Sequence, residues 1–199
     1  MSDRMLNKVV IITGGASGIG EGMVQRFCAE GARVVLADVD TKNGRRVSAQ
    51  CGALFQEHDV SSETSWQSLE DTIRQDYGQL DALLNNAGIV SNQSIVDVDV
   101  ATWNRLMSVN LTGMMLGCQT GITLMRENSG GNGGAIVNTA SSTSYLAIPS
   151  DAAYPTSKAG VVRFTKSVAV VCATEGHNIQ VKSIHQVAPP THHLQPAMG

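Results

Sequence analysis

The chain has 199 residues, 42% of them hydrophobic, and a formal net charge of −3. This composition predicts one folded domain over residues 1–199, with enough apolar side chains for a core. The lysines and arginines are scattered and only 4% of residues are aromatic, which argues against a nucleic-acid-binding surface. The apolar runs are too short for a membrane span and no signal-peptide pattern is present, so we expect a cytoplasmic protein that binds neither nucleic acid nor membrane.

The first predicted elements are a strand, a glycine-rich turn and a helix. The strand is the β-branched run Lys8–Thr13, and the helix is the amphipathic segment Ile19–Glu30. Between them, the turn Gly14–Gly20 spaces its glycines as Gly-x-x-x-Gly-x-Gly. Glycines let a backbone approach phosphates and a helix start attracts their charge, so this segment favours a dinucleotide pyrophosphate. The alternative is an ordinary glycine-rich hairpin.

The second predicted strand, Arg33–Asp38, ends in a carboxylate about twenty residues after the glycines. An acid at this position accepts hydrogen bonds from the adenosine ribose and repels a 2′-phosphate. Neither Ser17 nor Val39 supplies a cation for such a phosphate, so NAD is favoured over NADP. Alternatively, Asp38 is a turn former or the N-cap of a segment that begins at Thr41.

The rest of the chain continues to alternate helices and strands, which predicts a doubly wound, Rossmann-type parallel sheet of six strands. Ser129–Gly134 is expected to be a surface loop. Polar and glycine residues converge where strands end, at the edge where such sheets bind ligands. The convergent residues are Gly14, Asp38, Asp59, Asn85 and Ser141. The remaining predicted strands are 54–58, 82–85, 135–139 and 180–185, and the remaining helices are 63–77, 102–127 and 152–174.

Tyr154 and Lys158 stand four residues apart and therefore share one face of the last predicted helix. A nearby ammonium favours the phenolate and lowers the pKa of a tyrosine, which makes the phenol a usable acid–base group at neutral pH. Ser141 adds a hydroxyl that could hold a substrate oxygen during proton transfer. The alternative is an exposed helical pair without chemistry.

Metal chemistry is not expected. The four cysteines lack a Cys-x-x-Cys pair, and the five histidines lack a matching ligand set. Reduced thiols at Cys28, Cys51, Cys118 and Cys172 are therefore favoured over disulfides or a metal site.

The order of these motifs resembles the classical short-chain dehydrogenases/reductases. The similarity extends from residue 8 to about residue 185. The residues around the motifs are most similar to those of NAD-dependent bacterial hydroxysteroid and secondary-alcohol dehydrogenases. The matching motifs are Thr13-Gly14-x-x-x-Gly18-Ile19-Gly20, Asp59-Val60, Asn85-Asn86-Ala87-Gly88, Asn110, Ser141 and Tyr154-x-x-x-Lys158.

The resemblance implies a role for each matching residue. The catalytic set would be Asn110, Ser141, Tyr154 and Lys158, in which Tyr154 transfers the proton, Ser141 orients the substrate and Asn110 supports a water relay to Lys158. Without the resemblance, Asn110 could be a solvated polar residue in mid-helix. Residues expected at the NAD site are Gly14, Ser17, Gly18 and Ile19 at the pyrophosphate, Asp38 at the ribose, Asp59 and Val60 at the adenine, Asn86, Ala87 and Gly88 along the cofactor, and Tyr154, Lys158 and Thr191 near the nicotinamide.

We therefore expect a dinucleotide-binding domain that transfers a hydride between NAD(H) and a secondary alcohol or ketone, with steroids and cyclic alcohols as candidate substrates. The alternative is a non-catalytic NAD-binding or interaction paralogue. Its basis is the C-terminus, where Gln186–Thr191 replaces the family's Pro-Gly pair and the chain ends at Gly199, before a seventh strand and the substrate-covering helices. Pro155 is compatible with the motif only if Tyr154 lies in the first helical turn.

The same features predict a homo-oligomer. Family members assemble through the seventh strand and through two long helices, and only the helices, near 102–127 and 152–174, are present here. The later helix carries many apolar residues, so we expect a two-fold dimer with weak or absent activity and with strand 180–185 at the sheet edge. The apolar residues are Val161, Val162, Phe164, Val168, Val171 and Cys172.

Overall fold

A computed structural model describes residues 4–187, so the predicted contact of Thr191 lies outside the described residues. Six parallel strands form one sheet in the order β3-β2-β1-β4-β5-β6. The strands are β1 (Val9–Thr13), β2 (Arg33–Asp38), β3 (Leu54–Glu57), β4 (Ala82–Asn85), β5 (Gly134–Ser141) and β6 (Ile179–Gln186). The order changes direction between β1 and β4, which is the switch point of a doubly wound sheet. The predicted Rossmann-type fold is confirmed.

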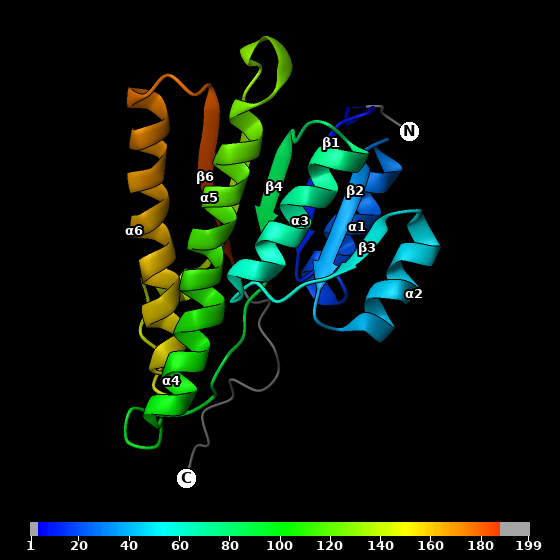
Figure 1. The fold of residues 1–199 in the computed structure, drawn as a ribbon. Helices are drawn as coiled ribbons and strands as arrows, with labels where there is room; N and C mark the ends of the chain where they lie inside the picture. The colour runs from blue at the N-terminus through cyan, green and yellow to red at the C-terminus, as the bar shows by residue number, and fades with distance from the viewer. Residues whose placement is uncertain (1–3, 188–199) are drawn as a thin grey trace.

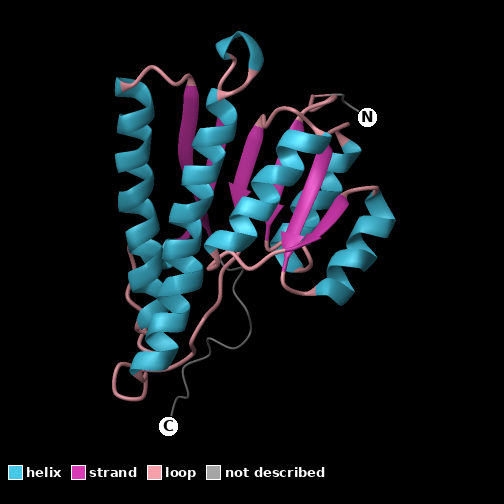
Figure 2. Ribbon diagram, in the orientation of Figure 1, coloured by secondary structure: helices cyan, strands magenta, loops and turns pink. Residues whose placement is uncertain are grey.

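Helices cover both faces of this sheet (Figures 1 and 2). The helices are α1 (Gly18–Ala29), α2 (Thr41–Cys51), α3 (Glu63–Asp76), α4 (Val100–Met107), α5 (Gly113–Arg126) and α6 (Ala153–Thr174). Side chains alternate across β1, so Ile11 packs into the apolar layer below α3, α5 and α6, and Ile12 into the layer below α1 and α2. Because β1 is buried on both faces, its uninterrupted β-branched sequence is the expected one for a central parallel strand.

The long helix predicted over 102–127 is divided into two. A π-helical turn, Ser108–Thr112, joins α4 to α5 and carries Asn110 on its inner side. Such turns insert one extra residue into the helical hydrogen-bond pattern and often mark functional sites. Apolar periodicity does not reveal a single π-helical turn, so the sequence predicted one continuous helix.

Helix α6 differs from prediction in how it uses its apolar residues. Val161, Val162 and Cys172 are buried in the core, whereas Val170 and Val171 are exposed. The predicted surplus of apolar surface on this helix is therefore smaller than expected. Strand β6 forms one edge of the described sheet, as predicted. Within the described residues, no helix is long and apolar enough to cross a membrane.

Candidate active site

A cavity of about 790 Å³ opens at the carboxyl ends of the strands. Its wall includes the predicted residues Gly14, Ser17, Gly18, Ile19, Asp38, Asp59, Val60, Asn86, Ala87 and Gly88. Tyr154, Lys158 and Ser141 are not among its lining residues, and Asn85 points away into the core, where its Nδ2 donates to Asn138 Oδ1 at 2.9 Å. Of the five residues predicted to converge at strand ends, Gly14, Asp38 and Asp59 therefore line this cavity, whereas Asn85 and Ser141 do not.

The glycine turn lines this cavity, and its backbone packs closely against neighbouring backbone. Gly14 has a φ of +66°, and a Cβ at that position would lie 2.8 Å from the Ala87 Cα. A Cβ on Gly20 would lie 1.9 Å from the Gly14 carbonyl oxygen. Both positions therefore require glycine, and the turn leads from a parallel strand into α1 rather than into a hairpin.

The segment after β4 is bound to this turn by Thr13. The Thr13 hydroxyl accepts hydrogen bonds from the backbone N–H groups of Asn86 and Ala87, at 3.0 and 3.1 Å. In return, Asn86 Nδ2 donates to the carbonyls of Thr13 and Gly14. These bonds hold the two cavity walls at a fixed separation, a function of Thr13 that its place in the motif did not predict.

Asp38 lies at the end of β2, where its carboxylate accepts hydrogen bonds from the backbone N–H groups of Ala16 and Asp40, both at 2.9 Å. It does not cap α2, because Asp40 is the residue that accepts the N–H of Asn43. The alternative role of Asp38 as an N-cap is therefore excluded, although it does form a local turn. Its position on the cavity wall directly beside the glycine turn is the predicted one.

Asp59 and Val60 follow β3 on the same wall. Hydrogen bonds from the Ser61 side chain and backbone N–H hold the pKa of Asp59 below its usual value. Val60 is buried, and its carbonyl accepts the indole N–H of Trp66 at 2.8 Å. The local hydrogen bonds thus fix an ionised carboxylate at this end of the cavity.

Tyr154 and Lys158 stand on the first turns of α6, with Pro155 in the first turn as its restricted φ requires. The Lys158 Nζ lies 5.7 Å from the centre of the Tyr154 ring and donates to the Thr139 carbonyl at 2.7 Å. Lys158 is 4% exposed, and burial lowers the pKa of its ammonium to about 8. An exposed helical pair is therefore excluded.

Gly88 connects this pair with the cavity. A Cβ on Gly88 would lie 3.3 Å from Asn110 Oδ1 and 3.4 Å from Lys158 Nζ, so both side chains approach the backbone there. Asn110 is 2% exposed, and it exchanges two hydrogen bonds with the Ile89 backbone, at 2.8 and 2.9 Å. Its Nδ2 also donates to Ser157 Oγ at 3.0 Å. The alternative of a solvated mid-helix asparagine is wrong.

Ser141 ends β5 and begins the 3₁₀ turn Ser142–Ser144, which packs against α6. Its Oγ accepts hydrogen bonds from the backbone N–H and the hydroxyl of Thr143, at 3.2 and 3.0 Å. Because the oxygen is the acceptor in both contacts, the hydroxyl proton remains available for donation to another oxygen.

Asp151 was not predicted as a site residue. It is 2% exposed, and its carboxylate accepts the Tyr154 N–H at 2.9 Å and the Ala153 N–H at 3.1 Å, which caps α6. The same carboxylate accepts the backbone N–H groups of Ser91 and Asn92 and the Ser91 hydroxyl, at 2.6–2.9 Å. Asp151 therefore ties the loop after β4 to the start of the helix that carries Tyr154. An aspartate three residues before the tyrosine of an N-terminal helical turn is a capping signal that could have identified it.

Comparison with known proteins agrees with this geometry. The model of the short chain dehydrogenase family matches residues 8–195. The chain is 37% identical over 187 residues to a 3-beta-hydroxysteroid dehydrogenase of Comamonas testosteroni, covering 93% of this chain and 72% of that protein. It is 36% identical over 189 residues to an NADP-dependent (R)-specific alcohol dehydrogenase of Lentilactobacillus kefiri, covering 93% of this chain and 74% of the relative.

Two further similarities extend this result. A cyclopentanol dehydrogenase of Comamonas sp. is 36% identical over 187 residues, which cover 92% of this chain and 73% of that enzyme. The crystal structure of a short chain dehydrogenase from Mycobacterium smegmatis superposes with a TM-score of 0.86 at 28% identity, covering 92% of this chain and 78% of that structure. This chain therefore belongs to the short-chain dehydrogenase family of oxidoreductases.

Proposed function

We propose that this protein is an NAD-dependent dehydrogenase that interconverts a secondary alcohol and a ketone, and that residues 1–199 act as one dinucleotide-binding domain. The observation that carries the proposal is the buried Lys158 ammonium, which lies near both the Tyr154 ring and Gly88, a residue of the cavity wall. A phenol and a buried cation on the same helix face form a pair that would exchange a proton with an alcohol hydroxyl.

The residues of the cavity fit a nicotinamide dinucleotide. Close approach at Gly14 and the start of α1 suit a pyrophosphate, which Gly14, Ser17, Gly18 and Ile19 would hold. Asp38 would accept the adenosine ribose hydroxyls, and Asp59 and Val60 would border the adenine. Asn86, Ala87 and Gly88 would follow the cofactor towards Tyr154 and Lys158. When bound, the nicotinamide would supply the site that accepts or returns a hydride.

The protein's own groups would manage the proton. Ser141 would donate a hydrogen bond to the substrate oxygen, and Tyr154 would take the hydroxyl proton as the carbinol hydrogen leaves with its electron pair. Lys158 would stabilise the phenolate, and Asn110 would fix the backbone at Ile89 on the route towards Lys158. In the reverse direction, Tyr154 would return the proton to the ketone oxygen.

Cofactor choice follows from the adenosine end of the cavity. Asp38 would repel a 2′-phosphate, and its neighbour Val39 supplies no cation. One relative, 36% identical, is named as NADP-dependent. The preference of this chain for NAD is therefore tested by comparing its affinities for NADH and NADPH.

The substrate class follows from the loops beside Tyr154. Val90, Ile95 and Val96, in the segment after β4, are 54%, 72% and 87% exposed, and Tyr145 and Leu146, after β5, are 69% and 64% exposed. Apolar side chains on both loops suit a substrate with an apolar body. Relatives named for hydroxysteroids and cyclopentanol support a cyclic or steroid alcohol.

We also propose a two-fold dimer that associates through α4–α5 and α6, with the exposed Val170 and Val171 in the contact. Light scattering tests this proposal: a dimer whose dissociation increases in a Val170→Ser, Val171→Ser variant supports it, and a monomer at all concentrations contradicts it. The cytoplasmic location remains a prediction.

The activity is tested by following NADH absorbance with a panel of cyclic and steroidal secondary alcohols, beside an NADH-binding titration. We expect turnover with at least one alcohol and its loss in Tyr154→Phe, which deletes the proton acceptor but keeps the ring. NADH binding without turnover on any alcohol would instead support a non-catalytic NAD-binding protein. A Tyr154→Phe variant with near-normal kcat would remove Tyr154 from the chemistry.

A further inference from the structure

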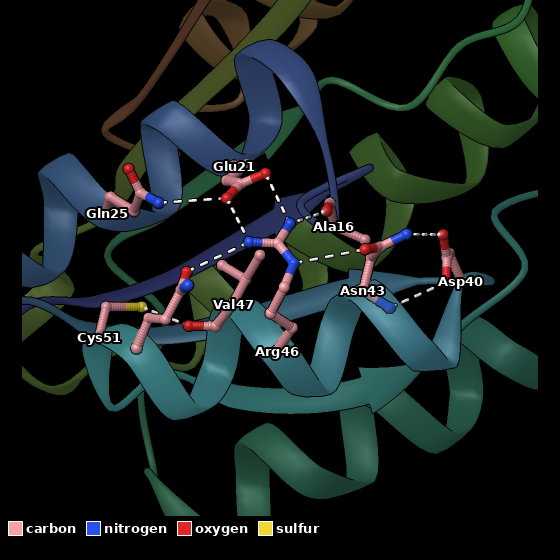
Figure 3. Close-up of polar contacts among 9 residues, drawn as sticks. Ala16, Glu21, Gln25, Asp40, Asn43, Arg46, Val47 and Cys51 are labelled. Carbon is pink, nitrogen blue, oxygen red and sulfur yellow. Dashed lines mark hydrogen bonds and ion pairs between the residues drawn. The ribbon is translucent and has the colours of Figure 1, made fainter.

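Arg46 on α2 lies against the glycine turn, and each of its five N–H groups has an acceptor (Figure 3). Its two terminal nitrogens bind the two carboxylate oxygens of Glu21 on α1, at 2.8 and 2.9 Å. The other acceptors, at 3.3–3.5 Å, are Asn43 Oδ1, Gln50 Oε1 and the Ala16 carbonyl. Because a guanidinium has only five N–H donors, this one has none left for a ligand.

The Arg46 guanidinium lies close behind the wall that would face the adenosine ribose. It contacts the carbonyl of Ala16, and the N–H of the same residue donates to Asp38 at 2.9 Å. Ser17 and Val39, the chain neighbours of this contact, both line the cavity. A single residue therefore separates a fully engaged cation from the carboxylate expected at the ribose.

The partner of Arg46 keeps it in place at neutral pH. The hydrogen bonds from Arg46 hold the pKa of Glu21 below its usual value, so Glu21 is ionised there. A bidentate guanidinium–carboxylate pair has a defined geometry, which a phosphate could also satisfy. Glu21 and a ligand phosphate are therefore alternative partners for the same guanidinium.

We propose that the ion pair with Glu21 prevents Arg46 from binding a phosphate at the 2′ position of the adenosine ribose. Together with Asp38, this ion pair would select against NADP. The inference rests on the proposed binding of a nicotinamide dinucleotide in the cavity. Asp38 acts by repelling the additional phosphate. Glu21 acts by occupying the cation that would otherwise bind it, so the two acids have separable effects.

The distinctive expectation is that the two effects depend on each other. In Asp38→Asn, repulsion is removed but Arg46 stays paired, so we expect NADPH affinity to rise about tenfold. In Glu21→Gln, the ion pair and one of the two hydrogen bonds between this side chain and Arg46 are lost, but Asp38 still repels the phosphate, so the gain should be less than about threefold. In the double variant, Arg46 can reach the phosphate, and affinity should rise about a hundredfold, more than the product of the single gains.

The experiment is a fluorescence titration of each variant with NADH and with NADPH, which differ only in the 2′-phosphate. Adding Arg46→Met to the double variant should remove the extra gain, because methionine retains much of the length without the charge. NADH affinity should change less than about threefold in Glu21→Gln, whose substitution lies outside the cavity wall. Glu127→Gln is the matched control, since it breaks a similar bidentate contact with Arg74 between α3 and α5.

The outcomes are distinct. A Glu21→Gln effect confined to NADPH, enlarged by Asp38→Asn and lost with Arg46→Met, supports the proposal. A gain that survives Arg46→Met, an equal gain in Glu127→Gln, or no gain in the double variant while NADH still binds, overturns this inference alone. Failure of the unmodified protein to bind NADH would overturn the proposed cofactor site and this inference together.

Discussion

Replacing Asp151 should damage both the stability and the chemistry of this protein, because one buried carboxylate receives five hydrogen bonds from two separate segments. Loss of a helix cap typically costs about 1 kcal/mol, and each hydrogen bond to a charged group contributes about 1.5–3 kcal/mol. The full sum overestimates the loss, since water would hydrate some of the released donors. For Asp151→Ala we expect a decrease of about 3–4 kcal/mol in the free energy of unfolding, or about 6–16 °C in Tm.

Asp151→Asn separates the two contacts of this side chain. Its single oxygen can keep the cap of α6, but its NH2 group then faces the N–H donors of Ser91 and Asn92. We therefore expect a smaller loss of stability, about 2 kcal/mol, with a marked fall in kcat because the loop beside Tyr154 is released. Asp99→Ala is the control: Asp99 caps α4 at an exposed position and should cost about 1 kcal/mol.

The assay is urea unfolding at pH 7, followed by the same measurement at lower pH. Burial raises the pKa of Asp151, but hydrogen bonds from Ser91, Tyr154 and Asn92 outweigh burial and hold the pKa below its usual value. The stabilisation by the carboxylate is therefore present above about pH 4 and is lost as the pH falls through the lowered pKa. An Asp151→Ala variant whose unfolding free energy at pH 7 equals that of the unmodified protein within about 0.5 kcal/mol would refute this reasoning.

Three further changes test other parts of the structure. Burial lowers the pKa of His58 to about 4, from the ordinary 6.5. As the pH falls, the unfolded chain therefore binds a proton before the folded protein does, and the free energy of unfolding should decrease by about 3 kcal/mol between pH 6.5 and pH 4. His58→Leu should flatten that part of the curve in urea unfolding, and an unchanged slope would contradict the assignment. Gly88→Ala should lower kcat about tenfold or more, because its methyl group would crowd Asn110 and Lys158, and an unchanged kcat would show that the two side chains yield freely. Asn110→Ala should lower both Tm, by several degrees, and kcat, because it removes both hydrogen bonds to the Ile89 backbone. Calorimetry and steady-state kinetics measure the two effects, and a lower Tm with an unchanged kcat would show that Asn110 has only a structural role.

Much of the fold could be predicted because short segments of the sequence are sufficient to indicate it. Strand β1 is an uninterrupted β-branched run, as a strand buried on both faces requires, and the glycines at 14 and 20 occupy positions where a Cβ would clash. The expectation that such sheets bind ligands where their strands end likewise predicted the positions of Asp38 and Asp59 on the cavity wall, because parallel strands end at one edge of the sheet.

What escaped prediction depends on contacts between distant segments. The π-helical turn at Asn110 is stabilised by Ile89, twenty-one residues away, and leaves no trace in apolar periodicity. The hydrogen bonds between Asp151 and the loop after β4 join residues about sixty positions apart. The sequence predicts an interface at Val161 and Val162 of α6 because it does not reveal how deeply these two residues pack into the core. The residues of the Glu21–Arg46 pair are likewise ordinary surface charges until α1 and α2 are placed together.

The most direct test of the central claim is to follow the hydrogen itself. The protein is incubated with NAD and a secondary alcohol that carries deuterium on the carbinol carbon, and the reduced cofactor is analysed by mass spectrometry and NMR. We expect one deuterium at C4 of the nicotinamide ring, a matching ketone product, and no transfer in Tyr154→Phe. Reduced cofactor without deuterium, or no reduction with any alcohol of the panel while NADH binds, would contradict the claim that this protein is an NAD-dependent secondary-alcohol dehydrogenase.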